Sequence, residues 1–147
     1  MSSIKDIQND IVEEFALLAD DREATLFYLM ELGDKMAPLP EEYKTDENLI
    51  KGCQSKVWLH AEMRDGKVFY QADSNTDITR GLISLLVRVL SGHTPDEILD
   101  ADLDFIQRIG MHQLIGSQRS NGLNAMIKQM KLYALGFKTK EASKENG

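Results

Sequence analysis

The stretch Leu49-Ile50-Lys51-Gly52-Cys53-Gln54-Ser55-Lys56-Val57-Trp58-Leu59 holds the only cysteine and the only tryptophan of the 147-residue chain. Gly52 relaxes the backbone immediately before Cys53, and Val57-Trp58-Leu59 favours the start of a β-strand. We therefore expect Cys53 at a loop-to-strand junction, where functional groups are commonly presented. Cys53 is the first candidate for a functional residue, and a small buried side chain without chemistry is the alternative.

Two lysines flank this cysteine in the sequence. Lys51 lies two residues before Cys53 and Lys56 lies three residues after it. Positive charge near a thiol favours the thiolate, which is the nucleophilic form. In an extended segment Lys51 and Cys53 point to the same side, so we expect Lys51 to lower the pKa of the Cys53 thiol.

The residues before this stretch predict two helices and a loop. An N-cap serine and apolar residues at helical spacing predict a helix over residues 3–19. A second helix begins at Asp20 or Asp21 and ends at Gly33. We expect this helix to bury its apolar residues, Leu26, Phe27, Leu29, Met30 and Leu32. The proline-containing segment 37–48 cannot sustain a helix and predicts a surface loop.

The residues after it predict a β-hairpin followed by more helices. Segments 55–63 and 68–72 are strand-like, and Arg64-Asp65-Gly66-Lys67 is a hairpin-turn signal. The first of these helices is expected to begin within residues 73–76 and to end at Val89 or Leu90, and a short one runs from the capping box at Thr94 to about Leu99. A further short helix is expected over 102–109. The last helix is expected from Ser117 or Ser120 to about Leu135, with Leu132 in its apolar set. This order predicts an α+β fold in which several helices pack against a small antiparallel sheet. Residues 138–147 are polar and predict a disordered tail.

Composition and charge limit the functions that the chain can have. The chain is 42% hydrophobic, which suffices for one domain core, and its net charge of −7 argues against nucleic-acid binding. No apolar run approaches the roughly 20 residues that cross a bilayer, and residues 1–5 lack the apolar core of a signal peptide, so we expect a cytoplasmic protein with no membrane contact. One cysteine permits no internal disulfide and cannot hold an iron–sulfur cluster within a single chain.

Three ordered blocks of sequence resemble the SufE family of sulfur acceptors. The segment from Ile50 to Leu59 resembles the cysteine motif of that family. Ala72-Asp73-Ser74-Asn75, and Ser117-Gln118-Arg119-Ser120-Asn121-Gly122-Leu123 leading into Ala125-Met126-Ile127, resemble two further blocks in the same order. The resemblance implies a single domain over residues 1–137 with a SufE/IscU-like fold.

The resemblance implies a sulfur carrier rather than an enzyme. A pyridoxal-phosphate-dependent cysteine desulfurase of the SufS type would form a persulfide, and Cys53 would accept its outer sulfur. The chain would stimulate the desulfurase and pass sulfur toward an iron–sulfur scaffold. Pyridoxal phosphate would belong to the partner, and we expect neither a cofactor nor a metal in this chain. The expected oligomeric state is a monomer or a weak homodimer.

Several residues besides Cys53 are candidates for the site. Lys51, Gly52 and Gln54 would form the loop that carries the thiol, with Gly52 as its hinge and the thiol partly shielded at rest. Asp73 is either a helix N-cap or, by the resemblance, an acidic residue for loop placement or partner contact. Arg119 is either a structural arginine or, by the resemblance, an arginine close to the acceptor cysteine.

A cysteine–histidine hydrolase or acyltransferase is the alternative from another class. It requires an imidazole within hydrogen-bond reach of Cys53. If the intervening chain is extended, His60 lies more than about 20 Å from Cys53. His93 is expected in a surface loop, and the position of His112 relative to Cys53 does not follow from sequence.

Overall fold

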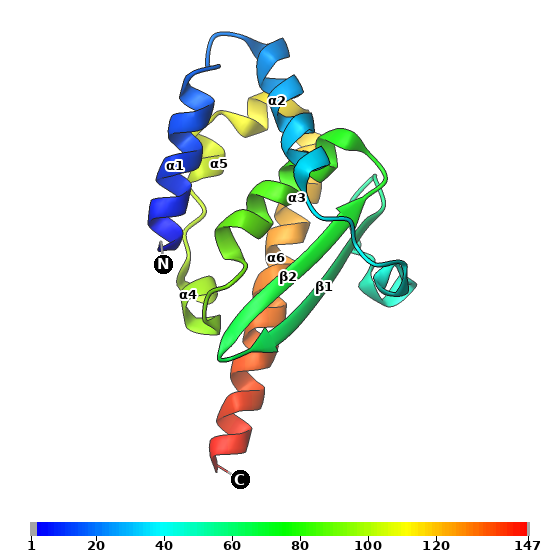
Figure 1. The fold of residues 1–147 in the computed structure, drawn as a ribbon, viewed down its shortest axis with the longest axis vertical. Helices are drawn as coiled ribbons and strands as arrows, with labels where there is room; N and C mark the ends of the chain where they lie inside the picture. The colour runs from blue at the N-terminus through cyan, green and yellow to red at the C-terminus, as the bar shows by residue number, and fades with distance from the viewer. Residues whose placement is uncertain (1–2, 147) are drawn as a thin grey trace.

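The fold is built around a two-stranded antiparallel sheet and a helix that follows it directly (Figure 1). The computed structural model describes the backbone of residues 3–146 and the side chains of residues 3–141. Strand β1 (Val57–Arg64) pairs with β2 (Lys67–Ser74) in a register that runs from Val57↔Ser74 to Arg64↔Lys67. The connecting Asp65 and Gly66 have φ values of 52° and 79°, and the positive φ at both positions is what a tight two-residue hairpin requires.

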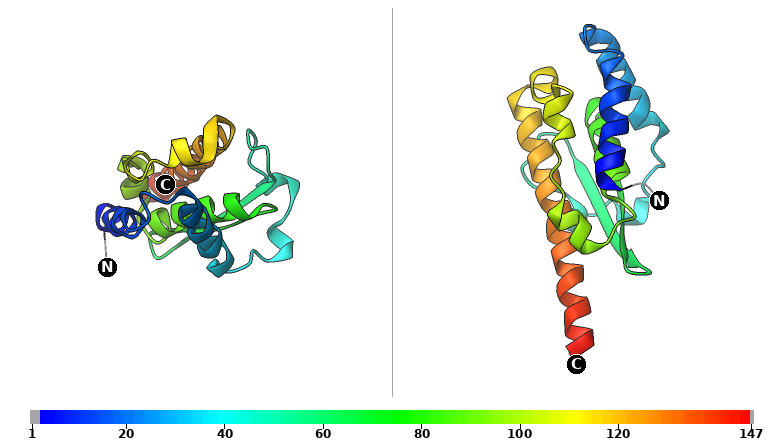
Figure 2. Two further views of the ribbon diagram at one scale, coloured as in Figure 1. Left: turned by 90° about the horizontal axis from the view of Figure 1, so that it is seen from above. Right: turned by 90° about the vertical axis from the view of Figure 1, so that its left-hand side faces the viewer.

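The helices are arranged around α3 (Asp77–Leu90), which contacts α1, α2, α6 and β2. The other elements are α1 (Ile4–Ala16), α2 (Arg22–Lys35), the 3-10 turns η1 (Glu41–Tyr43) and η2 (Asp46–Asn48), α4 (Pro95–Asp100), α5 (Phe105–Arg108) and α6 (Met111–Asn146). Figure 2 shows that α6 runs along the molecule and that its C-terminal part projects beyond the sheet. The α+β class predicted from the sequence is confirmed.

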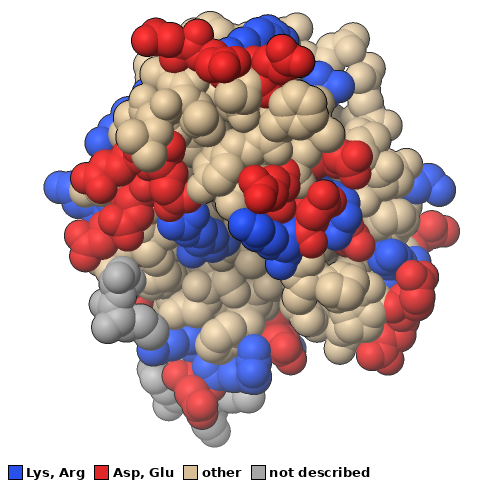
Figure 3. Space-filling model, turned by 45° about the horizontal axis from the view of Figure 1, so that its top comes forward, with Lys and Arg blue, Asp and Glu red and all other residues tan. Residues whose placement is uncertain are grey.

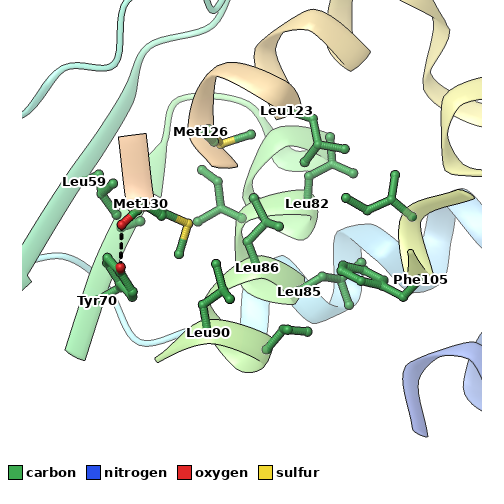
Figure 4. Close-up of a cluster of buried hydrophobic side chains, with 14 of the residues drawn as sticks. Leu59, Tyr70, Leu82, Leu85, Leu86, Leu90, Phe105, Leu123, Met126 and Met130 are labelled. Carbon is green, nitrogen blue, oxygen red and sulfur yellow. Dashed lines mark hydrogen bonds between the residues drawn. The ribbon is translucent and has the colours of Figure 1, made fainter. Parts of the chain in front are cut away.

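The core lies between the sheet, α3 and α6 (Figure 4). Its buried side chains include Leu59 and Tyr70 from the sheet, Leu82, Leu85, Leu86 and Leu90 from α3, and Leu123, Met126 and Met130 from α6. Each fully buried apolar side chain contributes about 1.5–3 kcal/mol relative to exposure. The hydroxyl of Tyr70 donates a 2.6 Å hydrogen bond to the carbonyl oxygen of Met130, so this buried polar group is satisfied. These contacts fix α6 against the sheet and thereby position the residues that face Cys53.

Helices α2 and α3 approach closely because each has a glycine at the contact. A Cβ atom on Gly81 would lie 2.2 Å from the carbonyl oxygen of Leu29, and one on Gly33 would lie 2.7 Å from the backbone nitrogen of Gly81. The prediction that Gly33 ends α2 is therefore wrong. The helix continues to Lys35, and Gly33 serves the packing of the two helices rather than a C-cap.

The predicted helix starts are largely confirmed. Ser3 caps α1 by accepting a hydrogen bond from the backbone of Asp6, and Asp21 caps α2. The capping box at Thr94 is present in full. Helix α1 ends at Ala16 and not near residue 19, because residues 17–20 form turns.

The start of the last long helix agrees with the prediction, and its end does not. A helical segment over Met111–Ile115 precedes Gly116, whose φ of 83° and ψ of 168° interrupt the helix, so the long part begins after Gly116. The segment 138–146, predicted as a disordered tail, instead continues α6 as a helix. Gly147 lies outside the described residues. The segment has no Gly or Pro and is rich in Lys, Glu and Ala, which are good helix formers, and it extends a helix that has already formed.

Three predictions of burial are wrong. Phe27 and Leu132, expected in the core, are 63% and 48% exposed, because the buried faces of their helices are formed by neighbouring residues. His93, expected in a surface loop, is buried, and its carbonyl oxygen accepts a hydrogen bond from the backbone of Val68. That isolated bridge covers the outer edge of β2, as a second bridge between Leu49 and Trp58 covers the outer edge of β1.

Candidate functional site

Cys53 lies in a short loop whose ends are tied together by the backbone. The nitrogen of Ile50 donates a 2.9 Å hydrogen bond to the carbonyl oxygen of Val57, so residues 51–56 form a closed excursion before β1. Gly52 has a φ of 96°, which a residue with a side chain adopts only with strain. We refer to residues 51–56 as the cysteine loop. The predicted loop-to-strand junction is confirmed, and Gly52 permits its turn.

The cysteine loop rests against α6 at Gly122. The thiol of Cys53 donates a hydrogen bond to the carbonyl oxygen of Gly122, with the sulfur 3.5 Å from the oxygen. A Cβ atom on Gly122 would lie 3.4 Å from the Cys53 sulfur, and one on Gly52 would lie 3.5 Å from the methyl group of Ala125. Helix α6 is therefore in direct contact with the loop. The cysteine is half-buried as a result.

A small cavity of about 90 Å³ adjoins the sulfur of Cys53. Its apolar wall comes from Leu82 of α3 and from Met126 of α6. Its polar wall comes from Gln54 and Ser55 of the loop, Thr79 of α3, and Gln118, Arg119 and Gly122 of α6. The cavity brings together the first and third sequence blocks, whose contacting residues Cys53 and Gly122 are 69 positions apart in the sequence.

Hydroxyl groups form a chain along the polar wall of this cavity. The hydroxyls of Ser55 and Thr76 lie 3.0 Å apart, and the hydroxyl of Thr79 donates to that of Ser55 over 3.5 Å. The backbone nitrogen of Lys56 donates to the side chain of Asn75. These hydrogen bonds connect the C-terminal half of the cysteine loop to the start of α3. Among the described residues, Gly52 and Gln54 form no hydrogen bond of this kind.

Burial raises the pKa of the Cys53 thiol above its ordinary value. The cause is desolvation, because half-burial disfavours the charged thiolate. The prediction that Lys51 lowers this pKa is wrong for the resting protein: Lys51 is exposed to solvent, which screens its charge, whereas the thiol faces the carbonyl of Gly122. Cys53 is thus held mainly as a thiol in this conformation.

Asp73 connects three elements and does not cap a helix. It lies in β2 opposite Trp58, and its carboxylate contacts Arg80 of α3 at 2.9 Å and Lys44 of the 37–48 segment at 3.5 Å. The residue before α3 is Thr76, so the N-cap interpretation of Asp73 is wrong. Since the 37–48 segment leads directly into the cysteine loop, Asp73 helps to fix where that loop begins.

None of the three histidines lines the cavity beside Cys53, as far as the described residues show. The ring of His60 stacks on that of Tyr43 at 3.8 Å, and His112 lies with its Nδ1 atom 2.8 Å from the hydroxyl of Ser120. His93 is buried beside β2. The geometry therefore supplies no imidazole as a general base for Cys53 in the resting protein.

Some residues of the site were missed by sequence reasoning. Ser55 and Gly122 lay within blocks that were identified, but nothing marked them individually as neighbours of Cys53. Thr79 gave no signal at all, because a threonine within an apolar helix pattern is not distinctive. Arg119 and Gln54 do line the cavity, while Lys51 lines a separate groove.

Two further findings concern metal ions and membranes. Within residues 3–141, no three His, Cys, Asp or Glu side chains gather closely enough to hold a metal ion. No described helix combines the length and the apolar character that crossing a bilayer demands.

The fold and the site define a class of protein: a small α+β domain that presents one half-buried loop cysteine against a long helix. The sequence model of the SufE family, described as an Fe–S metabolism associated domain, matches residues 9–134. Since this match covers most of the chain, the chain belongs to the SufE family.

Relatives with similar sequences carry the same family name. The chain is 38% identical to an uncharacterised SufE-like protein of Synechocystis sp., over 86% of this chain and 79% of that protein. It is 37% identical to an uncharacterised SufE-like protein of Rhizobium meliloti, over 87% and 94% of the two chains. It is also 41% identical to SufE-like protein 1, chloroplastic/mitochondrial, of Arabidopsis thaliana, over 76% of this chain and 30% of that longer protein.

A solved structure confirms the fold. The solution structure of a hypothetical protein from Thermus thermophilus superposes with a TM-score of 0.75, covering 90% of this chain and 96% of the other, at 21% identity. At this identity the likeness concerns the arrangement of helices and strands alone.

Proposed function

We propose that this protein is a sulfur carrier that accepts persulfide sulfur on Cys53 from a cysteine desulfurase and delivers it to iron–sulfur cluster assembly. The observation that carries the proposal is the placement of the chain's single cysteine on a tight loop, in a small cavity, within a domain of the SufE family. The desulfurase, of the SufS type, holds the pyridoxal phosphate. The protein itself performs no turnover, and its place of action is the cytoplasm.

The chemical step is an attack by sulfur on sulfur. The Cys53 thiolate attacks the outer sulfur of the partner's persulfide, a new S–S bond forms on Cys53, and the old S–S bond breaks so that the partner's inner sulfur leaves as a thiolate. The proton of the Cys53 thiol is released before the attack. No oxidant or reductant is needed, because the sulfane sulfur only changes its carrier. The partner is thereby freed for another cycle, which is how the carrier stimulates it.

The resting geometry suits a carrier that must keep its sulfur from other reactions. An exposed thiolate is oxidised readily, and an exposed persulfide is lost to ambient thiols. Half-burial against Gly122 lowers both access and thiolate content. Transfer then requires the cysteine loop to move outward, and Gly52 supplies the backbone freedom for that movement. Arg119, exposed at the mouth of the cavity, is placed to stabilise negative charge on sulfur during the exchange.

The test is direct observation of sulfur on Cys53. The purified protein is mixed with a cysteine desulfurase and free cysteine, without reductant, and its intact mass is measured. We expect a gain of sulfur that disappears on adding a thiol reductant, together with faster desulfurase turnover.

The Cys53→Ser variant is the matched control for this measurement. It should fold normally, because serine is close in size, and it should neither gain sulfur nor stimulate the enzyme. Full stimulation by a folded Cys53→Ser protein would refute carriage and leave activation through binding alone.

A further inference from the structure

The charges of this acidic protein are distributed unevenly along the chain. The 36 residues from 105 to 140 contain six Lys or Arg and no Asp or Glu, so this segment carries +6 while the rest of the chain carries −13. The segment comprises α5 and most of α6. Figure 3 shows that acidic and basic side chains are interspersed on one face of the molecule. Helix α6 therefore forms a local basic surface on a protein that is acidic overall.

Among the described residues, the cations without partners gather around the cysteine loop. Most described Lys and Arg side chains form ion pairs or bond to carbonyl oxygens. Within residues 3–141, those that make no such contact with other described residues are Lys5, Lys51, Lys56, Arg119, Lys128 and Lys140. Lys51 and Lys56 belong to the cysteine loop, and Arg119 lines the Cys53 cavity. Lys128 shares a groove with Lys51. Of these six cations without partners among the described residues, three thus lie in the cysteine loop or at its cavity, and Lys128 lies in the groove that Lys51 also lines.

That groove leads away from Cys53 along α6. It has a volume of about 480 Å³, and its two walls are residues 47–51 and the face of α6 from Ala125 to Tyr133. Gly122 contacts Cys53 and Ala125 approaches Gly52, so the groove begins where the cysteine loop ends. Leu132 lies about 15 Å along the helix axis from Gly122, at 1.5 Å per residue. The groove therefore extends well beyond the cavity and is a separate surface.

The lining of the groove is partly apolar. Leu49, Ala125, Leu132 and Tyr133 contribute to it, and Leu132 is 48% exposed. Lys51 and Lys128, on the same face, have no partners among the described residues. An exposed apolar side chain beside unpaired charges is typical of a surface that binds a partner. Glu47, at the far end of the groove, is the one carboxylate among its lining residues.

We propose that this groove docks the sulfur-donating desulfurase through a segment that carries carboxylates beside an apolar side chain. This inference rests on the proposed function for the identity of the partner, and it deepens that function by assigning the docking surface. The partner's carboxylates pair with Lys51 and Lys128 at the end near Cys53, and its apolar side chain covers Leu132. Glu47 repels carboxylates from the far end, which fixes the orientation of the segment.

Docking at this position acts on the cysteine loop. The groove wall formed by Leu49 and Ile50 continues directly into Lys51 and Gly52. A carboxylate that pairs with Lys51 contacts the residue next to Gly52, whose positive φ is the permissive point of the loop. The surface therefore delivers the partner beside the thiol.

The test uses matched charge reversals. Binding is measured by fluorescence anisotropy between a cysteine desulfurase, with its persulfide-forming cysteine replaced by serine, and variants of the Cys53→Ser protein, so that no sulfur exchange takes place. We expect Lys51→Glu/Lys128→Glu to weaken binding by about tenfold or more, since like charges are then opposed across the interface. Lys5→Glu/Lys140→Glu changes the net charge equally, on free cations away from the groove, and should bind within about twofold of the parent protein.

The contribution of the apolar side chain to binding is tested with a second pair of variants. Leu132→Ser should weaken binding by about fivefold or more, whereas Leu17→Ser, at a leucine that is 87% exposed on another part of the molecule, should leave it unchanged. Carbodiimide coupling, which joins lysine amines to carboxylates, should give cross-linked peptides that contain Lys51 or Lys128. Equal effects of groove and control variants, or cross-links only through other lysines, would overturn the docking surface.

A failure of the docking surface can be distinguished from a failure of the carrier function. If Cys53 of the wild-type protein takes up sulfur while the groove variants bind as tightly as the controls, the groove is not the docking surface and carriage stands. If the groove variants lose binding while Cys53 takes up no sulfur, the docking surface stands and carriage fails.

Discussion

The sulfur of Cys53 lies 3.5 Å from the carbonyl oxygen of Gly122, with the thiol as donor. A carbonyl oxygen accepts a hydrogen bond from a thiol but repels a thiolate, because both then carry negative charge. The contact therefore suits the protonated, unreactive form of the side chain. In the proposed transfer, Cys53 has to lose its proton and to leave its position against α6 before its sulfur attacks. The proposal therefore couples deprotonation of Cys53 to movement of the cysteine loop.

Labelling of Cys53 should be slow in the free protein and should accelerate on docking. With a small alkylating agent, we expect a rate below that of the unfolded chain, and a pH profile whose midpoint lies above the ordinary thiol pKa, since burial raises the pKa. A desulfurase without its persulfide-forming cysteine should increase the rate and shift the midpoint downward. Labelling of the free protein as fast as the unfolded control would contradict shielding.

The same pKa shift predicts how stability depends on pH. The folded state holds the Cys53 thiol at a raised pKa, so its contribution is present in full below the unfolded pKa and is lost as the pH rises through the folded pKa. Urea unfolding of wild type and Cys53→Ser should therefore show a difference that changes only in the alkaline range. A change confined to acidic pH would show that another group is responsible.

Arg119 should matter for transfer and not for folding. Its side chain is exposed at the cavity beside Cys53, and it forms no hydrogen bond or ion pair with the described residues. Arg119→Ala should change the free energy of unfolding by about 0.5 kcal/mol or less, while slowing sulfur uptake by Cys53. Arg119→Lys should restore part of the rate, because a lysine keeps the charge but lacks the planar guanidinium. A loss of several kcal/mol in Arg119→Ala would instead make the residue structural.

The helices and the hairpin followed from local patterns, because caps, apolar spacing and turn residues act over a few neighbouring residues. Ser3, Asp21 and the Thr94 capping box were identified in this way. The contact between Cys53 and Gly122 could not be predicted from local patterns, because it depends on how α6 crosses the loop. The direction of the Cys53 pKa shift was misjudged for the same reason: lysines close in sequence are visible, and burial by a distant helix is not.

Gly33 shows a related limit of sequence reasoning. A glycine near the end of a helical pattern is typical of a C-cap, but here it allows α2 to approach α3. Only the crossing of two helices distinguishes these roles. Of the two interpretations of Asp73, the helix N-cap is likewise wrong, because its carboxylate pairs with Arg80 and Lys44, which lie in other parts of the chain.

Gly81→Ala should be strongly destabilising. The added Cβ atom would lie 2.2 Å from the carbonyl oxygen of Leu29, so α2 and α3 would have to separate. We expect a loss of about 3 kcal/mol or more in the free energy of unfolding, measured by urea denaturation. Gly136→Ala is the matched control, because its added Cβ would meet no described atom within 4 Å beyond its chain neighbours and the backbone of its own helix, and it should stabilise α6 by about 0.5–1 kcal/mol. Equal stability of the two variants would show that the helices tolerate separation.

Gly122→Val should release Cys53 from its resting position. A Cβ atom added to Gly122 would lie 3.4 Å from the Cys53 sulfur, which is ordinary van der Waals contact. The two further methyl groups of valine would therefore occupy the space of the thiol. Because Gly52 permits the loop to turn, we expect the loop to yield and α6 to stay in place. Alkylation of Cys53 should become faster than in wild type, and its pH midpoint should fall, since the desolvation that raises the pKa is relieved.

The variant should also separate shielding from transfer. Sulfur taken up by Cys53 in Gly122→Val should be lost to added glutathione faster than in the wild-type protein, while uptake from the desulfurase continues. Gly136→Val places the same residue on α6 at an open position and should alter neither labelling nor persulfide lifetime. If Gly122→Val leaves the labelling rate unchanged, or if Gly136→Val accelerates it equally, then contact with Gly122 does not shield the thiol, and the protection of Cys53 must come from the rest of the cavity wall.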